Sequence, residues 1–176
     1  MSTTTIDSTV RLTQEQSDLL ETLQTHRAFL RFTVRDLTEQ QARQRTTTSQ
    51  LILGGLVKHV TATEAQWADF IVRGAAAMAA SVDDEQAYAG GFTMTDGETL
   101  AGLLDEYDAV AQRTDGLIRT LPDLDASHEL PPAPWWPAGK RYSARRVLLH
   151  LIAETSQHAG HADIVRESLD GQRTMG

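Results

Sequence analysis

Apolar residues recur at helical spacing in several long segments of the chain. In the first, from Thr13 to about Leu37, leucine and valine are separated by three, four or seven residues, as on one face of an α-helix. Thr13 and Gln16 have the spacing of a capping box. We therefore predict an amphipathic helix over this segment, and its apolar face carries Leu19, Leu23, Leu30, Val34 and Leu37.

A second long helix is predicted after a short polar interruption. Thr38 and Gln41 repeat the capping spacing and open the short segment LTEQQARQR, and the polar run TTTSQ that follows is typical of a loop. Beyond it, ILGGLVKHVTATEAQWADFIVRG keeps the helical period up to Gly74, a residue type that commonly ends helices. The apolar face of this helix carries Leu56, Val60, Trp67, Phe70 and Ile71.

The third helix follows a segment without a clear period. Residues 75–92, which include a glycine pair near their end, predict a connection with a short helical piece. Thr95 and Glu98 have capping spacing ahead of LAGLLDEYDAVAQRTDGLIRTL, so we expect this helix to start there. Pro122 ends it, because proline lacks the backbone donor that a helix interior needs.

The fourth helix is expected after a proline-rich loop of about twenty residues, a length that is often functional in compact domains. Ser143 is its expected N-cap, and the helical pattern runs to Leu169 before Gly171. No segment alternates apolar and polar residues over a useful length, as a strand would. The sequence therefore predicts an all-α fold, a four-helix bundle with long crossover connections, in a single domain over residues 1–176.

Composition restricts the chemistry that a site in this chain can use. The chain has 176 residues, 40% of them hydrophobic, which suits one domain with one core. It contains no cysteine, so disulfides, thiolate metal sites and cysteine nucleophiles are excluded, and nitrogen and oxygen would have to bind any metal. The N-terminus has no secretory pattern and no apolar run is long enough to span a membrane, so we expect a soluble cytoplasmic protein.

Charge argues against nucleic acids as partners. The formal net charge is −8 at pH 7, which repels phosphate backbones. The basic cluster KRYSARR contains Arg141, Arg145 and Arg146, which form either a solvated surface or a site for an anionic substrate near the start of the fourth helix. Trp135 and Trp136 could cover the mouth of a pocket, pack the loop onto the bundle or bury a subunit interface.

The segment HLIAETSQHAGHADIVRE carries the strongest chemical signal. On a helix, His150, Glu154, His158 and His161 share a face about 80° wide, and this face coincides with the apolar side of the helix. Polar side chains that are buried need hydrogen-bond partners or a metal. The four residues are therefore candidates for a metal site or for a hydrogen-bonded cluster in the core.

The rise of the helix decides which of these residues could share an ion. Glu154 and His158 are one turn apart and can reach one point, whereas His150 lies about 12 Å from His158 along the axis. His150 could instead orient Glu154 from the turn below. His161 could be an alternative ligand or a base that lines a cavity.

A third ligand has to come from another helix. His59 is the leading candidate, because it lies at the edge of the apolar face of the second long helix. His26 in the first helix is the second candidate, and His128 in the proline-rich loop is the third. For each of them, a histidine that only satisfies hydrogen bonds in the core is the competing interpretation.

The segments GLVKHVTATEAQW and LLHLIAETSQHAGHADIVRESLDG together resemble the mini-circle protein branch of the DinB-like superfamily over nearly the whole chain. The resemblance implies a DinB/YfiT-like bundle in which a histidine of the second helix meets a later pair of ligands around zinc or nickel. His59 matches the first position and His158 the last, with Glu154 where the commonest form has a histidine. This set is similar to that of the N-terminal domains of mycothiol-dependent maleylpyruvate isomerases, and it leaves one zinc position open.

The resemblance also implies an activity. Related members look like S-transferases that join mycothiol or bacillithiol to electrophiles, and a divalent ion, zinc or alternatively nickel, would lower the pKa of such a thiol. We therefore expect a small-molecule thiol and an electrophile as partners, and the superfamily is compatible with a homodimer. A metal-dependent hydrolase and a non-catalytic metal-binding stress-response protein are the alternatives.

Overall fold

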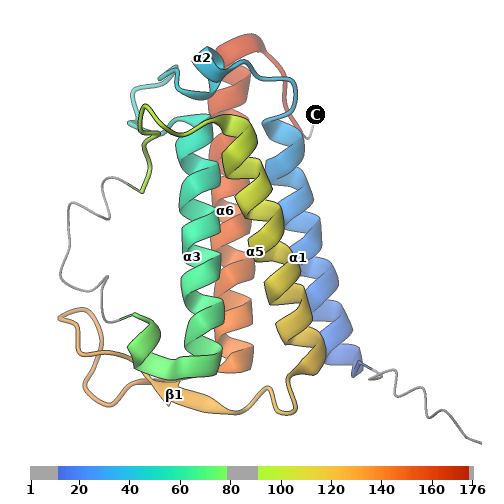
Figure 1. The fold of residues 1–176 in the computed structure, drawn as a ribbon, viewed down its shortest axis with the longest axis vertical. Helices are drawn as coiled ribbons and strands as arrows, with labels where there is room; N and C mark the ends of the chain where they lie inside the picture. Colours follow the sequence, from blue (N-terminus) through green and yellow to red (C-terminus); the bar gives the residue numbers. More distant parts are fainter. Residues whose placement is uncertain (1–11, 79–90, 175–176) are drawn as a thin grey trace, which may run out of the picture.

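The computed structural model describes residues 12–78 and 91–174. Four long helices form the main body of the protein (Figure 1): α1 (Gln14–Thr33), α3 (Leu53–Arg73), α5 (Leu100–Thr120) and α6 (Ala144–Asp170). Helices α1 and α3 each pack against both α5 and α6. The protein is therefore an all-α helical bundle, which confirms the predicted fold class.

The four long helices run in two opposite directions along the bundle (Figure 1). Helices α3 and α5 run in the same direction, whereas α1 and α6 run in the opposite one (Figure 1). The connection from α3 to α5 therefore returns from one end of the bundle to the other, as a long crossover does. Helix α5 ends where α6 begins, so the proline-rich connection joins two helix ends at the same end of the bundle.

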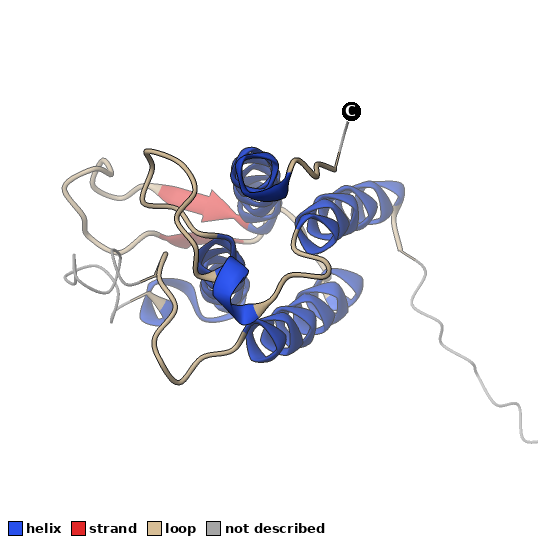
Figure 2. Cartoon of the chain, turned by 90° about the horizontal axis from the view of Figure 1, so that it is seen from above, coloured by secondary structure: helices blue, strands red, loops and turns tan. Residues whose placement is uncertain are grey.

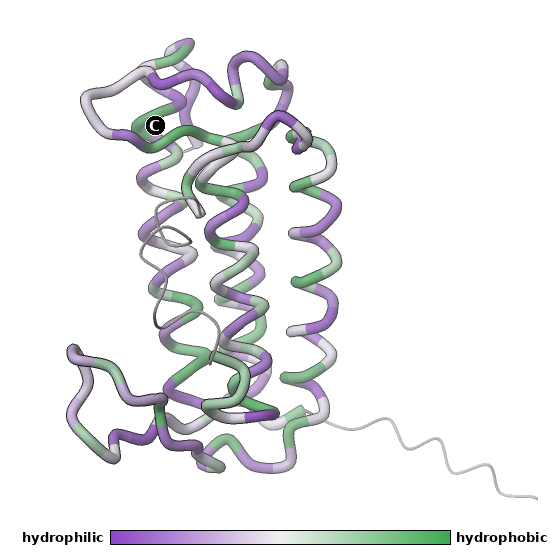
Figure 3. Tube along the Cα trace, turned by 60° about the vertical axis from the view of Figure 1, so that its left-hand side comes forward, coloured by the Kyte–Doolittle hydropathy of each residue, from purple (hydrophilic) through white to green (hydrophobic). Residues whose placement is uncertain are grey.

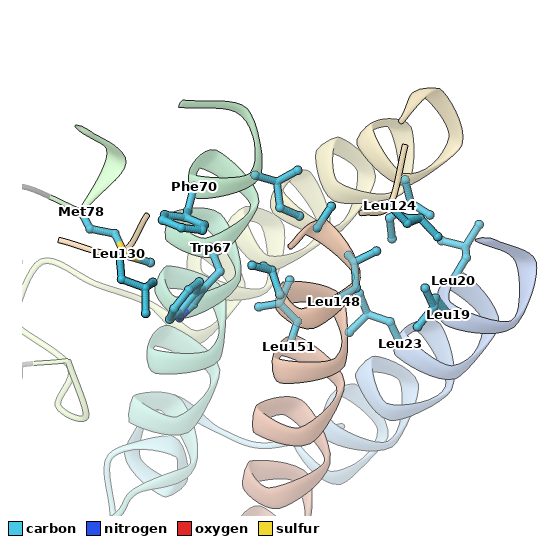
Figure 4. Close-up of a cluster of buried hydrophobic side chains, with 14 residues drawn as sticks. Leu19, Leu20, Leu23, Trp67, Phe70, Met78, Leu124, Leu130, Leu148 and Leu151 are labelled. Carbon is cyan, nitrogen blue, oxygen red and sulfur yellow. The ribbon is translucent and has the colours of Figure 1, made fainter. Parts of the chain in front are cut away.

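Apolar side chains from all four long helices fill the interior. In one cluster, which includes Leu23, Trp67 and Leu151, side chains from α1, α3 and α6 point toward one another (Figure 4). A second cluster includes Leu30 and Val60. Hydrophobic and hydrophilic positions alternate along each helix (Figure 3), as expected of amphipathic helices. In the described parts of the chain, no helix has both the length and the apolar character needed to cross a membrane.

Several predicted helix ends are confirmed. The Ser143 hydroxyl caps α6 by accepting a hydrogen bond of 3.2 Å from a backbone amide, and α6 ends at Gly171, which has a φ of 78°. The predicted capping box at Thr38 opens the short helix α2 (Glu39–Ala42). Helix α3 ends at Gly74, whose φ of 63° favours glycine.

The connection after α3 begins with a short helical piece, as expected. This piece is the 3₁₀ helix η1 (Gly74–Ala77). Residues 79–90 lie outside the described part of the chain, so the rest of the prediction for residues 75–92 is tested only at its two ends.

The predicted end of α1 was wrong. The helix was predicted to reach Leu37 but ends at Thr33. Asp36 adopts a φ of 56°, which breaks the helical path. Arg166 of α6 donates hydrogen bonds of 2.8 and 2.7 Å to the carbonyl oxygens of Thr33 and Arg35. A buried side chain from another helix thus satisfies carbonyl groups at the end of α1, and a further turn is not needed.

The predicted start of α5 was also wrong. Thr95 and Glu98 form a turn in which the Glu98 amide donates to the Thr95 carbonyl oxygen at 3.1 Å. The helix begins only after Thr99, whose hydroxyl accepts a hydrogen bond of 3.1 Å from the Gly102 amide. Arg43, just after α2, donates to the carbonyl oxygens of residues 94, 95 and 98 and holds the turn in place. This long-range contact explains why local capping spacing gave the wrong start.

The proline-rich connection contains a small antiparallel hairpin that the sequence did not predict. Its strands are β1 (Ser127–Glu129) and β2 (Arg141–Ser143), with Ser127 opposite Ser143 (Figure 1; Figure 2). Strands of three residues are too short to show alternation. The Ala144 amide donates to the Ala126 carbonyl oxygen at 2.9 Å, so the hairpin fixes the first residue of α6.

Candidate metal centre

Three side chains from two neighbouring helices converge between α3 and α6. His59 comes from α3, and Glu154 and His158 come from successive turns of α6. Each offers one ligand atom, and the three atoms lie within 4.8 Å of one another. Ligands that each sit about 2 Å from an ion are about 3 to 4 Å apart, so small rotations of these side chains would complete a site. The group fits a divalent metal.

The contacts within the group are close. His158 Nε2 lies 3.4 Å from Glu154 Oε2. The rings of His59 and His158 meet edge to face, with their centroids 4.7 Å apart. The His158 side chain is buried, and the other two are half-buried. The position between two packed helices therefore partly excludes water from all three donors.

The protonation states suit a metal site. A hydrogen bond from His158 holds the pKa of Glu154 below its usual value, although burial of this carboxyl opposes the effect. Burial lowers the pKa of His59 to about 4, with a further contribution from repulsion by His158. At neutral pH, Glu154 is therefore a carboxylate and His59 a neutral imidazole, the forms in which both residues bind metals.

Two further histidines of α6 flank the group. His150 Nε2 lies 3.8 Å from Glu154 Oε1, on the opposite oxygen from His158, and burial lowers the pKa of His150. His161 Nδ1 lies 3.4 Å from His158 Nδ1, so the Nε2 atom of His158 faces the carboxylate. These two contacts are of the kind that orients metal ligands from outside the coordination shell.

The other candidate ligands lie elsewhere. The His26 ring packs edge-on against Phe29 within α1. His128 Nε2 is 3.1 Å from the carbonyl oxygen of Ile71, and its ring meets Phe70. Within residues 12–78 and 91–174, neither joins the group formed by His59 and its two partners on α6.

The tryptophan pair of the proline-rich loop divides between surface and core. Trp135 is 63% exposed and touches the ring of Trp136 edge-on. Trp136 packs against Trp67 of α3, which in turn meets His150 at a centroid distance of 4.8 Å. Trp136 therefore reaches the surroundings of the site through Trp67, while Trp135 lies at the surface.

The arginines at the start of α6 have partners within the protein. Arg145 forms ion pairs with Glu15 and Asp125. Arg141 donates to the side chain and backbone of Ser127, and the guanidinium of Arg146 lies 4.7 Å from the centre of the Tyr142 ring. Two carboxylates thus balance the charge of Arg145.

One neighbour of the site was missed by the sequence reasoning. The ring of Phe92 stacks on His59 with a centroid distance of 3.9 Å and an angle of 20°. Phe92 lies at the end of a segment without periodicity, so the local pattern gave no reason to select it. The sequence feature that points to a close neighbour of His59 lies in α3, where Gly54 and Gly55 leave room for the backbone of another segment.

A helical bundle with an imidazole, a carboxylate and a second imidazole between two of its helices is the arrangement that the resemblance to the DinB-like superfamily implies. A comparison with protein families then narrows this class: the family model described as mycothiol-S-transferase matches residues 18–171. The chain belongs to the mycothiol-S-transferase family. No curated protein matches the chain.

Proposed function

We propose that the protein is a metal-dependent S-transferase that joins a low-molecular-weight thiol to an electrophile. The observation that carries this proposal is the convergence of His59, Glu154 and His158 to within 4.8 Å in a member of a mycothiol-S-transferase family. Mycothiol is the favoured thiol, and bacillithiol is the alternative. The proposal places the reaction in the cytoplasm, with no nucleic acid or membrane as a partner.

Zinc is the ion that we propose for the site, with nickel as the alternative. Two imidazoles and one carboxylate are a frequent protein donor set for catalytic zinc, and they leave a position for a substrate. When bound, a divalent ion of this kind lowers the pKa of a thiol ligand so that thiolate forms at neutral pH. Because the chain has no cysteine, the reacting sulfur has to come from the thiol substrate.

The residues of the chain prepare the site for this chemistry. Glu154 lies between His150 and His158, with Oε1 3.8 Å from Nε2 of His150 and Oε2 3.4 Å from Nε2 of His158. His161 contacts the Nδ1 atom of His158 and leaves Nε2 toward the site. The carboxylate would offset part of the charge of a divalent ion, and the low pKa of His59 keeps that imidazole a neutral donor.

Metal content tests the donor set. We expect about one zinc per chain in the wild-type protein, and little or none in His59→Ala or His158→Ala, because two remaining ligands bind weakly. His26→Ala is the matched control, since His26 lies on α1 beside Phe29, and it should keep its metal. Wild-type protein that stays metal-free after growth with added zinc or nickel would refute the site.

Turnover tests the reaction. The zinc-loaded protein should conjugate mycothiol to a model electrophile such as a chlorinated dinitrobenzene, and His158→Ala should reduce the rate to background. A rate of hydrolysis that is independent of thiol would point to a metal-dependent hydrolase. Metal binding without either reaction would point to a non-catalytic stress-response protein.

A homodimer stays a prediction, and the mass in solution from light scattering tests it.

A further inference from the structure

Phe92 lies directly on the candidate metal site. Its ring stacks on the imidazole of His59 with a centroid distance of 3.9 Å, and it also meets the ring of His158 at 5.8 Å. Phe92 thus touches a ligand from each of the two helices. An aromatic ring stacked on an imidazole limits the rotation of that imidazole, and it offers no hydrogen bond to water on the side that it covers.

Two glycines of α3 bring the backbone of Phe92 this close. A Cβ atom on Gly55 would lie 2.5 Å from the carbonyl carbon of Phe92 and closer still to its oxygen, and a Cβ atom on Gly54 would overlap the sulfur of Met94. Gly55 is one helical turn before His59, so a chain seated on Gly55 places the Phe92 ring over the next turn. The close approach that the glycine pair allows therefore brings the Phe92 ring over His59.

The segment that carries Phe92 is held from both sides. It crosses the start of α3 before it enters α5 (Figure 1). Lys58, the neighbour of His59, donates a hydrogen bond of 3.2 Å to the carbonyl oxygen of Thr93 and forms an ion pair of 2.8 Å with Glu98. Arg43 donates to the Met94 carbonyl oxygen at 3.1 Å. These contacts fix the backbone next to Phe92, so its ring has a defined place.

We propose that Phe92, seated on Gly55, orients His59 and shields one side of the metal site from water, and thereby favours a thiol over water as the reacting ligand. The inference rests on the proposed S-transferase function and adds a residue that determines specificity. Water needs hydrogen bonds that an apolar wall cannot give, whereas a polarisable sulfur makes favourable contacts with aromatic rings. Exclusion of water also strengthens the interactions of charged groups inside the site.

The first test uses the metal as the probe and needs no turnover. Co²⁺ replaces the native ion, and its visible absorption is strong when it has four ligands and weak when water adds a fifth or sixth. Phe92→Ala should weaken the visible absorption and reduce Zn²⁺ affinity by about tenfold to a hundredfold, as loss of other groups that orient ligands does. Phe32→Ala is the matched control, because Phe32 is 47% exposed on α1, and both measurements should equal the wild type.

Two more variants distinguish the effect of losing the Phe92 ring from an effect of disturbing the fold. Gly55→Ala should reproduce both effects of Phe92→Ala, since the added methyl group displaces the Phe92 backbone. Phe92→Leu keeps an apolar cover without a stacked ring, so it should keep the strong Co²⁺ absorption and lose part of the Zn²⁺ affinity. If circular dichroism shows that Phe92→Ala has lost its helical structure, the test rests on Phe92→Leu instead. A Zn²⁺ affinity in Phe92→Leu equal to that of the wild type would then overturn the proposal.

The second test compares the two reactions. Phe92→Ala should lower the ratio of thiol conjugation to hydrolysis of the same electrophile by about tenfold, the size of effect that a single apolar contact in a pocket produces. An unchanged ratio together with unchanged Co²⁺ absorption would overturn the role of Phe92, while conjugation by the wild type would still stand. Changed Co²⁺ absorption in a protein that conjugates no thiol would leave the shield intact and refute the S-transferase function. A wild-type chain that binds no Co²⁺ would refute both.

Discussion

At the scale of single residues, an ion pair lies buried in the middle of the bundle. Arg27 of α1 donates two hydrogen bonds, of 2.9 and 2.6 Å, to the two carboxylate oxygens of Glu64 on α3. Their side chains are 7% and 1% exposed. Arg27 also reaches Asp115 of α5 at 2.6 Å. One guanidinium therefore joins three helices, and its charge has two carboxylates as partners.

Removal of one member of this pair should be costly. Glu64→Ala leaves Arg27 buried with Asp115 as its remaining carboxylate, and we expect the free energy of unfolding to fall by about 3 to 5 kcal/mol. Asp108→Ala is the matched control, because the Arg31–Asp108 pair has side-chain exposures of 47% and 45%, and it should cost less than about 1 kcal/mol. Urea unfolding followed by circular dichroism measures both values. Equal losses in the two variants would show that burial of the pair has no energetic weight.

The local sequence pattern identifies some residues of the candidate site and not others. Glu154 and His158 could be paired from the sequence, because a separation of four residues on a helix fixes their distance. Phe92 could not be selected, because its contact with His59 depends on where a segment far along the chain crosses α3. The glycine pair beside His59 is a signal of close approach, but it does not say which segment approaches.

At the scale of elements, the segment between residue 91 and α5 is tied to α3 by charge. Lys58 contacts both the backbone of this segment and the carboxylate of Glu98. The hydrogen bond from Lys58 holds the pKa of Glu98 below its usual value. Glu98 therefore binds its proton less readily in the folded protein than in the unfolded chain, and this difference links folding to pH.

The sign of this linkage gives a prediction. A carboxyl group whose pKa is lowered in the folded state adds stability above its unfolded pKa, and the contribution disappears as the pH falls through the lower folded pKa. Glu98→Gln should therefore reduce the free energy of unfolding at pH 7 by less than about 1 kcal/mol, since the pair is partly exposed, and this loss should shrink as the pH falls toward the lowered pKa of Glu98 in the folded protein. Urea unfolding of both proteins at pH 7, 5 and 3 checks this.

The matched control for this experiment is Glu106→Gln, on the exposed side of α5. It removes a carboxylate without removing the contact with Lys58, so it should change stability less than Glu98→Gln does at pH 7. A loss in Glu98→Gln that is as large at pH 3 as at pH 7 would contradict the linkage.

Helix boundaries show the limit of local prediction at this scale. The capping residues Thr13, Thr38 and Ser143 were predicted correctly, because each bonds to an amide in its own first turn. The end of α1 and the start of α5 were wrong, because Arg166 and Arg43 bring hydrogen-bond donors from other elements. Such partners are not visible in a local window of sequence.

At the scale of the whole molecule, the candidate metal site joins two helices that already pack together. The two apolar clusters contain residues of α3 and α6 other than the three candidate ligands. The bundle therefore has a core that does not depend on the metal. An ion that bound His59, Glu154 and His158 would add a further link between α3 and α6.

Removal of the metal should lower stability without unfolding the protein. A ligand that binds only the folded state stabilises it by an amount that grows with its concentration, about 2.7 kcal/mol when the free ligand is 100 times its dissociation constant. Protein treated with a chelator should keep its helical circular dichroism at 25 °C but unfold at a lower temperature, and added zinc should restore the midpoint. His158→Ala should not respond to zinc. An identical midpoint with and without metal, or loss of helix on chelation, would contradict this expectation.

The sequence by itself determined the helical fold class, the approximate extent of the four long helices and the pairing of Glu154 with His158. These features follow from relations within one segment, since the helical period and the one-turn separation of ligands are local geometry. From the sequence, the candidates for the third metal ligand were three histidines, at positions 26, 59 and 128. Only the tertiary structure shows that His59, the leading candidate, is the one that lies beside Glu154 and His158, because the packing of whole apolar faces sets which helices lie side by side. The same packing, together with the room left by Gly55, placed Phe92 on the site.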